Sequence, residues 1–185
     1  TWPCAASISS LVAFAPFETF LEERFRHLAD QITVTSRALE QRALALGIAR
    51  ERVHYIPSGA NVRTIPVLER ESCRRELSLP ESVPLACFVG FVQYDLALAV
   101  RAFAVARHSV PDAQLLLVGP RNREAERLTA ELGLSGAVHA TGTLPFPRVP
   151  VAMGAADVLL LPYSNNLTNR ARGPIKLGDY LSAGR

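Results

Sequence analysis

Several features that mark common protein classes are missing from this chain of 185 residues. It has no apolar run of 18 residues or more, so no membrane-spanning helix is expected. Its first residues lack the basic start and apolar run of a signal peptide, although Thr1 indicates that the true N-terminus is missing. The three cysteines, Cys4, Cys73 and Cys87, form neither a CxxC pair nor a metal-like spacing. We therefore expect a soluble cytoplasmic protein whose thiols are buried and reduced.

Lysine is almost absent as well, because 19 of the 20 basic residues are arginines and only Lys176 is a lysine. The arginines are scattered without interleaved aromatic residues, and the net charge is only +3, so no nucleic-acid partner is expected. The four histidines lie far apart in the sequence, and no group of His, Asp and Glu has ligand spacing. No metal site is therefore expected.

What the chain does contain is a regular alternation of apolar patterns. Short, continuously apolar segments typical of buried strands alternate with segments of helical periodicity. Such alternation predicts an α/β fold with a parallel sheet covered by helices on both faces. The strands are expected within 31–36, 52–61, 84–91, 113–120, 137–142 and 157–164, and the helices within 17–29, 37–47, 70–77, 94–109, 122–133, 147–156 and from Pro174 onward.

A change in composition divides the chain. Residues 62–83 are mostly polar and are punctuated by Pro66 and Pro80, which indicates a linker or a domain boundary. We expect residues 1–61 to be the end of one domain. Residues 84–185 are expected to form a second, truncated domain with a Rossmann-like parallel sheet.

The residues that follow the expected strands are candidates for a site, because parallel sheets bind ligands at the carboxyl ends of their strands. None of these segments reads GxGxxG or GxxxxGK[ST], which argues against dehydrogenases and P-loop NTPases. Each glycine among them has an ordinary explanation, a sharp turn after a strand. Four such strand ends in a row nevertheless favour a ligand groove, and they begin at Gly90, Gly119, Thr141 and Tyr163.

Lys176 stands at the start of the last expected helix. Pro174 suits the first helical position, because its missing N–H would have no partner within the helix. The N-terminus of that helix and the Lys176 ammonium would together form an anion site. Asp179, three residues further on, could accept hydrogen bonds from sugar hydroxyls. Equally, Lys176 and Asp179 could be ordinary solvated residues, and their spacing alone favours neither reading.

Beyond these patterns, the sequence resembles the group 1 glycosyltransferases. The resemblance is carried by DQITVTSRALEQRALALGIARERVHYIPSGAN, DAQLLLVGP, AVHATGTLPFPRVPVAMGAADVLLLPYS and PIKLGDYLSAG, whose order and spacing match the family from about residue 29 onward. VGF followed by YD, together with P-x-K-L-x-[ED]-Y-L-x-A-G, is closest to the branch of teichuronic-acid and other polysaccharide glycosyltransferases. The resemblance implies the two-domain GT-B fold, with this chain a fragment of it.

The resemblance also implies a function. These retaining enzymes transfer a sugar from a nucleotide-diphosphate sugar in the C-terminal domain to an acceptor in the N-terminal domain, with no metal or other cofactor. Here the implied acceptor is a polysaccharide or lipid-linked glycan, and contact of the missing segments with the inner membrane face stays open. No catalytic residue is assigned. By position, the donor-binding residues would be Gly90, Phe91 and Lys176 near the diphosphate, Gly119, Pro120, Thr143 and Leu144 toward the base, Asn165 and Asn166 near the sugar, and Pro174 and Asp179 at the last helix.

The sequence also departs from the family. Many members carry Arg and Lys where this chain has Phe91 and Leu96, and a glutamate where it has Ala171. Asp179 takes the place of a second glutamate and is one methylene shorter. Other side chains could replace the missing groups, namely Lys176, Arg121, Arg170 or Arg172 for the charge and Asn165 or Asn169 for the sugar contact.

Two other functions stay open at this point. The chain could be a catalytically impaired homologue that serves as a binding or partner subunit. It could also be a Rossmann-type enzyme that does not act on sugars and shares only the fold. A histidine and a glycine-rich loop in the absent N-terminal part would favour an active enzyme over a binding subunit.

Overall fold

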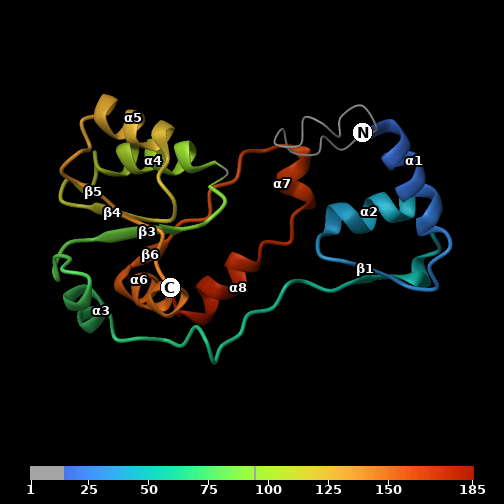
Figure 1. The fold of residues 1–185 in the computed structure, drawn as a ribbon, viewed down its shortest axis with the longest axis horizontal. Coiled ribbons are helices and arrows are strands. Elements are labelled where there is room, and N and C mark those ends of the chain that lie inside the picture. Colours follow the sequence, from blue (N-terminus) through green and yellow to red (C-terminus); the bar gives the residue numbers. More distant parts are fainter. Residues whose placement is uncertain (1–14, 94) are drawn as a thin grey trace. The chain divides into compact units, whose positions relative to one another are not determined.

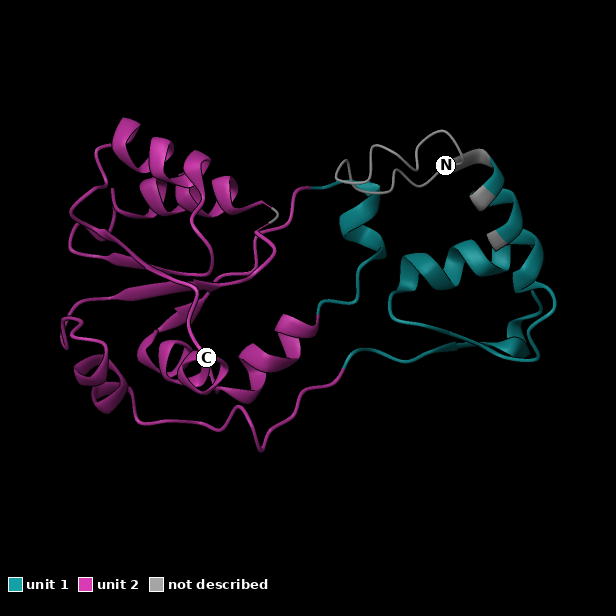
Figure 2. Ribbon diagram, viewed as in Figure 1, with its two compact units in different colours: residues 1–58, 165–174 teal, residues 59–164, 175–185 magenta. Residues whose placement is uncertain are grey.

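The computed structural model describes residues 15–93 and 95–185 (Figure 1). The chain divides into two compact units, coloured separately in Figure 2: unit 1 is residues 1–58 with 165–174, and unit 2 is residues 59–164 with 175–185. Cys4 lies outside the described residues, whereas Cys73 and Cys87 are free, buried thiols. In the described part of the chain, no helix is long and apolar enough to cross a bilayer.

Unit 1 is built on a β-α-β motif. Its two strands pair in parallel, with Ile32 opposite Val53. Four buried side chains join the strands to the intervening helix: Val34, Ala43, Ile48 and Val53. The elements of unit 1 are α1 (Ala15–Arg26), β1 (Ile32–Val34), α2 (Arg37–Ala45), the 3-10 helix η2 (Arg50–Arg52), β2 (Val53–Tyr55) and α7 (Leu167–Ala171).

Local chemistry fixes the ends of α2 as the sequence predicts. The Ser36 hydroxyl accepts a hydrogen bond from the Leu39 N–H at 3.2 Å, which satisfies one of the unpaired donors of the first turn. Past the C-terminal end, Gly47 has a φ of +80°, a left-handed conformation that glycine adopts without strain. The segment 165–174 packs against this motif, because α7 contacts α2 and Gly173 leaves no room for a Cβ beside Thr35.

Unit 2 is a four-stranded parallel sheet in the order β5-β4-β3-β6. The predicted parallel α/β fold is therefore confirmed. Its elements are α3 (Arg70–Glu76), β3 (Leu85–Val89), α4 (Leu96–Ala106), β4 (Gln114–Val118), α5 (Arg123–Glu131), β5 (Val138–Gly142), the 3-10 helix η3 (Phe146–Arg148), α6 (Val149–Ala155), β6 (Val158–Leu159) and α8 (Ile175–Ser182).

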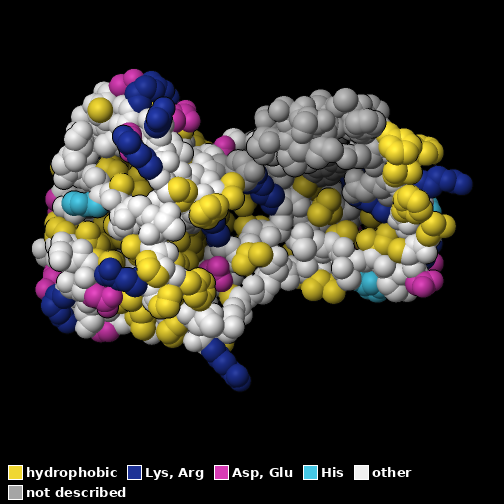
Figure 3. Space-filling view, in the orientation of Figure 1, with side chains coloured by type: hydrophobic (Ala, Val, Ile, Leu, Met, Phe, Trp, Pro, Cys, Tyr) yellow, Lys and Arg dark blue, Asp and Glu magenta, His cyan; other side chains and the backbone are white. Residues whose placement is uncertain are grey.

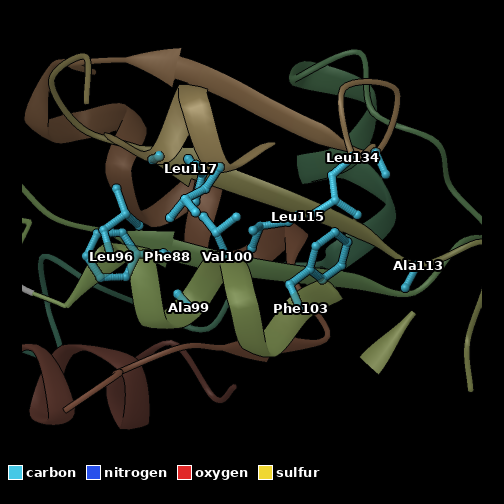
Figure 4. Packing of buried hydrophobic residues seen from close by; sticks show 12 residues of the cluster. Phe88, Leu96, Ala99, Val100, Phe103, Ala113, Leu115, Leu117 and Leu134 are labelled. Carbon is cyan, nitrogen blue, oxygen red and sulfur yellow. The ribbon is translucent and has the colours of Figure 1, made fainter. Parts of the chain in front are cut away.

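Helices cover both faces of this sheet, because alternate residues of a strand point to opposite faces. Leu115 and Leu117 of β4 pack with residues of α4 and α5, and Figure 4 shows them beside Val100 and Phe103 of α4. Leu116 and Val118, between and after them, pack on the other face with residues of α3 and α6. The unbroken apolar run of β4 is thus explained by burial on both sides.

The structure differs from the sequence prediction in four places. The helix α7 was not expected from the sequence. The strand β6 has only two residues, Val158 and Leu159, although the apolar run is longer. The helix α8 begins at Ile175, one residue later than the predicted start at Pro174, a difference within the usual uncertainty of helix ends. Residues 62–83 fall within unit 2 and include α3.

Candidate ligand-binding site

The carboxyl ends of β3, β4 and β5 meet at one edge of the unit 2 sheet. The Gly90 N–H donates to the Val118 carbonyl at 2.8 Å, and the Gly119 N–H donates to the Gly142 carbonyl at 3.0 Å. Three of the strand ends that the sequence singles out therefore lie side by side. Their loops leave the sheet together, which is where ligands bind in open parallel sheets.

Gly119 is required at this edge by its backbone. Its φ is +148°, a conformation that residues with a Cβ rarely adopt. A Cβ built on Gly119 would collide with the Gly90 carbonyl oxygen and would lie 3.0 Å from the Gln93 side-chain nitrogen. The glycine thus allows the ends of β3 and β4 to approach each other closely.

Tyr180 fixes α8 at the same edge. Its buried hydroxyl accepts a hydrogen bond from the Val89 N–H at 3.2 Å and lies 3.3 and 3.4 Å from the Val89 and Leu160 carbonyls. Burial raises the pKa of this phenol, and its main-chain contact to Val89 works in the opposite direction. The hydroxyl therefore stays protonated and ties α8 to the ends of β3 and β6.

Lys176 lies one turn before Tyr180 and on the same face of α8. Its ammonium is placed against the Cα of Gly90, where a Cβ at that position would collide with the Nζ atom. The same ammonium lies 4.7 Å from the centre of the Phe88 ring. The chain's single lysine is therefore held over the end of β3.

Asp179, next to Tyr180 on α8, is half-buried. Its carboxylate has no hydrogen-bond or ion-pair partner among the described residues. Burial raises the pKa of this carboxyl group. A desolvated acid without a partner costs stability, and a ligand that donates hydrogen bonds would offset that cost.

A small cavity brings five of the predicted donor-binding residues together. Its volume is about 170 Å³. That volume is below the roughly 300–1,000 Å³ of a complete ligand pocket, so it suits one group of a larger ligand. The lining residues are Val89, Gly90, Phe91, Val118, Gly119, Thr143, Leu144, Phe146 and Val149.

Pro120 lines a second cavity, of about 390 Å³, which shares Gly119 with the first and includes residues of α5. Gln93 organises the loops there, since it donates to the Pro120 carbonyl at 2.7 Å and accepts from the Asn122 amide at 3.0 Å. Asn122 in turn caps α5 by accepting from the Ala125 N–H at 2.9 Å. The loops after β3 and β4 are thus fixed to each other by side-chain amides.

Asp95 fixes a third loop. Its two carboxylate oxygens accept from the Ser164 hydroxyl at 2.7 Å and the Ser164 N–H at 3.2 Å. Asp95 has a left-handed backbone, with φ of 59°, and makes no side-chain cap to α4 although it stands at the cap position. The carboxylate therefore binds Ser164, in the segment after β6, and does not cap α4.

The other predicted residues, Asn165, Asn166 and Pro174, belong to unit 1. The Asn166 side chain caps α7 by accepting from the Asn169 N–H at 2.8 Å. The Asn165 side-chain oxygen accepts from Arg170 at 2.9 Å. Both amide oxygens are thus engaged in local contacts of unit 1.

Sequence reasoning missed four residues that shape this edge. Tyr180 carried a usable signal, because it lies one helical turn after Lys176. Asp95 was noted in the YD pair but given no role, since its bond to Ser164 spans 69 residues. Gln93 lies in a strand-end segment that was singled out, whereas nothing in the sequence marked Phe146.

Charge around the site comes from isolated groups. On the face shown in Figure 3, the Lys and Arg side chains of unit 2 are distributed over several places, with acidic side chains beside them. The described residues contain no group of three or more His, Cys, Asp or Glu side chains that could hold a metal ion. Leu96, the first residue of α4, is buried in the core.

Comparison with known proteins decides the family. The family model described as glycosyl transferases group 1 matches residues 69–184. The chain belongs to this family. This group 1 glycosyltransferase chain is 31% identical over 156 residues to 2-deoxystreptamine glucosyltransferase of Streptomyces kanamyceticus, which covers 80% of the chain and 40% of the relative. It is 28% identical over 165 residues to the putative teichuronic acid biosynthesis glycosyltransferase TuaH of Bacillus subtilis (strain 168). This match covers 89% of the chain and 41% of TuaH.

A solved structure supports the GT-B fold of this group 1 glycosyltransferase. HepE of Anabaena, in complex with UDP and glucose, matches with a TM-score of 0.58 and 19% identity, over 78% of this chain and 40% of HepE. At that identity the likeness concerns the fold alone. The chain spans about two fifths of the length of the curated relatives it matches.

Proposed function

We propose that this chain is the donor-binding portion of a glycosyltransferase that uses a nucleotide-diphosphate sugar. The acceptor hydroxyl would replace the nucleoside diphosphate at the anomeric carbon with retention of configuration. The observation that carries the proposal is the Lys176 ammonium, held over Gly90 at the carboxyl edge of a parallel sheet. Family membership and the cavity beside that ammonium support it.

The electrostatics of α8 support a diphosphate beside Lys176. A cation in the first turn of a helix is disfavoured by the helix dipole, by about 0.3–1 kcal/mol. Contact with the Phe88 ring offsets this by about 0.5–1 kcal/mol at an exposed site. A diphosphate would interact favourably with both the ammonium and the N-terminal N–H groups of α8. Binding of an anion would thus offset the unfavourable interaction of the ammonium with the helix dipole.

The remaining donor groups are assigned by position. We place the diphosphate at Gly90 and Lys176, the base toward Pro120, Thr143 and Leu144, and the ribose within reach of Asp179. For Asn165, Asn166 and Pro174, a donor contact is proposed from their positions in the sequence alone.

Metal-independent transfer is part of the proposal. The leaving diphosphate gains negative charge as its bond to the sugar breaks, and fixed positive groups can stabilise that charge. Lys176 and the N-terminus of α8 would supply them here.

For the acceptor we propose a polysaccharide or a lipid-linked glycan. The name of TuaH refers to teichuronic acid biosynthesis, whereas that of the Streptomyces relative refers to 2-deoxystreptamine. Relatives of similar identity thus differ in the acceptor that their names give. We infer that the donor-binding unit does not determine the acceptor.

The proposal is tested on the full-length protein with a panel of UDP-, GDP- and ADP-sugars. A donor at 100 times its Kd stabilises the folded state by about 2.7 kcal/mol, which thermal shift detects readily. We expect one nucleotide class to stabilise the protein and to be consumed with an acceptor glycan in the presence of EDTA. Stabilisation by no member of the panel would contradict the proposal, and an EDTA-sensitive activity restored by manganese would contradict metal independence.

A further inference from the structure

Two phenyl rings stand exposed at the small cavity of the carboxyl edge. Phe91 follows the end of β3 and is 77% exposed, and Phe146 begins η3 and is 60% exposed. Both line the cavity of about 170 Å³. Phe88, within β3 near the same edge, is buried in the core, so not every phenyl ring near this edge is exposed. Each exposed ring keeps an apolar face in water, which is unfavourable in free energy, and a stacking partner would remove that face from water.

The cavity also offers hydrogen-bond donors on the main chain. The N–H groups of Phe91, Thr143 and Leu144 donate to no partner among the described residues, whereas the N–H groups of Gly90 and Gly119 are paired within the sheet. Side chains of Leu144 and Val149 complete an apolar wall. The cavity therefore combines flat aromatic faces with main-chain donors at their edges.

This combination selects a planar, aromatic group that carries hydrogen-bond acceptors on its edge. A phosphate needs charge, which phenyl rings do not supply. A sugar presents hydroxyls in all directions and needs polar side chains, whereas the lining side chains other than Thr143 are apolar or glycine. A nucleobase has two flat faces for stacking and carbonyl or ring-nitrogen acceptors on its rim.

We propose that Phe91 and Phe146 are specificity-determining residues whose rings stack on the base of the donor, while the free N–H groups of Thr143 and Leu144 bind its edge. This inference rests on the proposed function and deepens it. It gives Phe91 a role that differs from the diphosphate contact implied by its position. Donor recognition at this edge would then be divided between the rings for the base and Lys176 for the phosphates.

If the rings bind the base and Lys176 binds the phosphates, variants of the rings should weaken binding of the nucleoside but not of pyrophosphate. Stacking on an aromatic ring is worth about 1–3 kcal/mol per base, which corresponds to about a 5- to 150-fold change in Kd. Phe146→Ala and Phe91→Ala should each weaken binding of the preferred nucleoside diphosphate by at least about fivefold. Phe146→Tyr should bind within twofold of wild type, because it keeps the ring. Val105→Ala, which trims an exposed apolar side chain elsewhere on unit 2, is the matched control.

The experiment is calorimetric titration of the full-length protein with UDP, GDP, ADP and inorganic pyrophosphate, and with the corresponding nucleoside. We expect the two alanine variants to lose affinity for the nucleoside diphosphate and the nucleoside but to bind pyrophosphate as wild type does. Equal loss for pyrophosphate and the nucleoside diphosphate would overturn the proposal, as would unchanged nucleoside binding. If wild type itself binds no nucleoside diphosphate, the proposed function fails; if wild type binds and the alanine variants match it, only this inference fails.

Discussion

The two edges of the unit 2 sheet hold their cations in different ways. At the amino edge, the Arg74 side chain is 2% exposed and donates to Asp157 at 2.7 Å and to the carbonyls of Ala155 and Glu81 at 2.8 and 2.7 Å. Asp157 also accepts from the Leu85 N–H at 2.7 Å. At the carboxyl edge, the Lys176 ammonium lies over a strand end and a phenyl ring.

The difference separates a structural cation from a candidate functional one. Arg74 is planar, carries five donors, and is surrounded by protein acceptors that leave no place for a ligand. Lys176 is a compact charge on a flexible stem, placed beside a cavity and main-chain N–H groups that have no described partner. An arginine at the amino edge thus stabilises the fold, whereas the single lysine stands where an anion can approach.

The largest effect is expected from removing the cation of the amino edge. Arg74→Met should destabilise the protein by about 3–5 kcal/mol, because Asp157 loses one of its cationic partners and the Ala155 carbonyl loses its buried donor. Urea unfolding measures this loss. The variant that remains folded should bind nucleoside diphosphate as wild type does. A stability loss below about 1 kcal/mol would contradict the stabilising role that we assign to the contacts of Arg74.

Removing the cation of the carboxyl edge should have the converse effect. Lys176→Ala should weaken binding of a nucleotide-diphosphate donor by about 1.5–3 kcal/mol, the range for hydrogen bonds to charged groups. Its folding stability should fall by no more than about 1 kcal/mol, through loss of the contact with Phe88. Lys176→Arg should recover only part of the affinity, because a planar fork does not replace a compact ammonium. Identical titration curves for wild type and Lys176→Ala would show that Lys176 does not contribute to donor binding.

Gly119 tests the carboxyl edge of the sheet without a change in charge, because it shapes that edge through its backbone alone. Gly119→Ala should cost about 1–3 kcal/mol of stability, since an alanine there has a strained φ and meets the Gly90 carbonyl oxygen. Gly136→Ala is the matched control, with open space around its Cβ and no left-handed backbone, and should change stability by about 0.5 kcal/mol or less. Chemical denaturation of both variants makes the comparison, and equal stabilities would show that close approach of the strand ends is not constrained.

The smallest effect concerns the pH dependence of the amino edge. Burial works to raise the pKa of Asp157, but the Leu85 N–H and the Arg70 and Arg74 guanidiniums outweigh it and hold the pKa below its ordinary value. The folded pKa lies below the unfolded one, so Asp157 stabilises the fold above the unfolded pKa and loses this effect as pH falls through the folded pKa. Wild type should therefore lose more stability than Asp157→Asn between pH 7 and pH 3. Parallel stability curves for the two proteins would contradict this sign.

Much of the fold could be predicted from the sequence because its signals are local. Continuous apolar runs such as β4 and the Ser36 cap of α2 depend on neighbours within a few residues. The helix α7 could not be predicted in this way, because its five residues lack a clear apolar period and its place depends on packing against α2. The two-residue length of β6 likewise depends on pairing with β3, which no local pattern encodes.

For the site, the sequence indicated which strand ends to examine but not how side chains cross between them. Gly90, Gly119 and Thr143 were found because they follow predicted strands. The Asp95–Ser164 and Tyr180–Val89 contacts join residues 69 and 91 positions apart and arise only from the strand order. The roles of the predicted donor-binding residues stay predictions until a ligand is bound.

The most direct test of the central claim is amide hydrogen exchange of the full-length protein with and without the preferred nucleoside diphosphate. Our account predicts slowed exchange in the segments that contain Gly90–Phe91, Thr143–Leu144 and the first turn of α8, and no change around Arg74. The Lys176→Ala variant should show the same segments protected only at higher ligand concentration. Protection confined to other parts of unit 2, with these segments unchanged at saturating ligand, would contradict a donor site at the carboxyl edge.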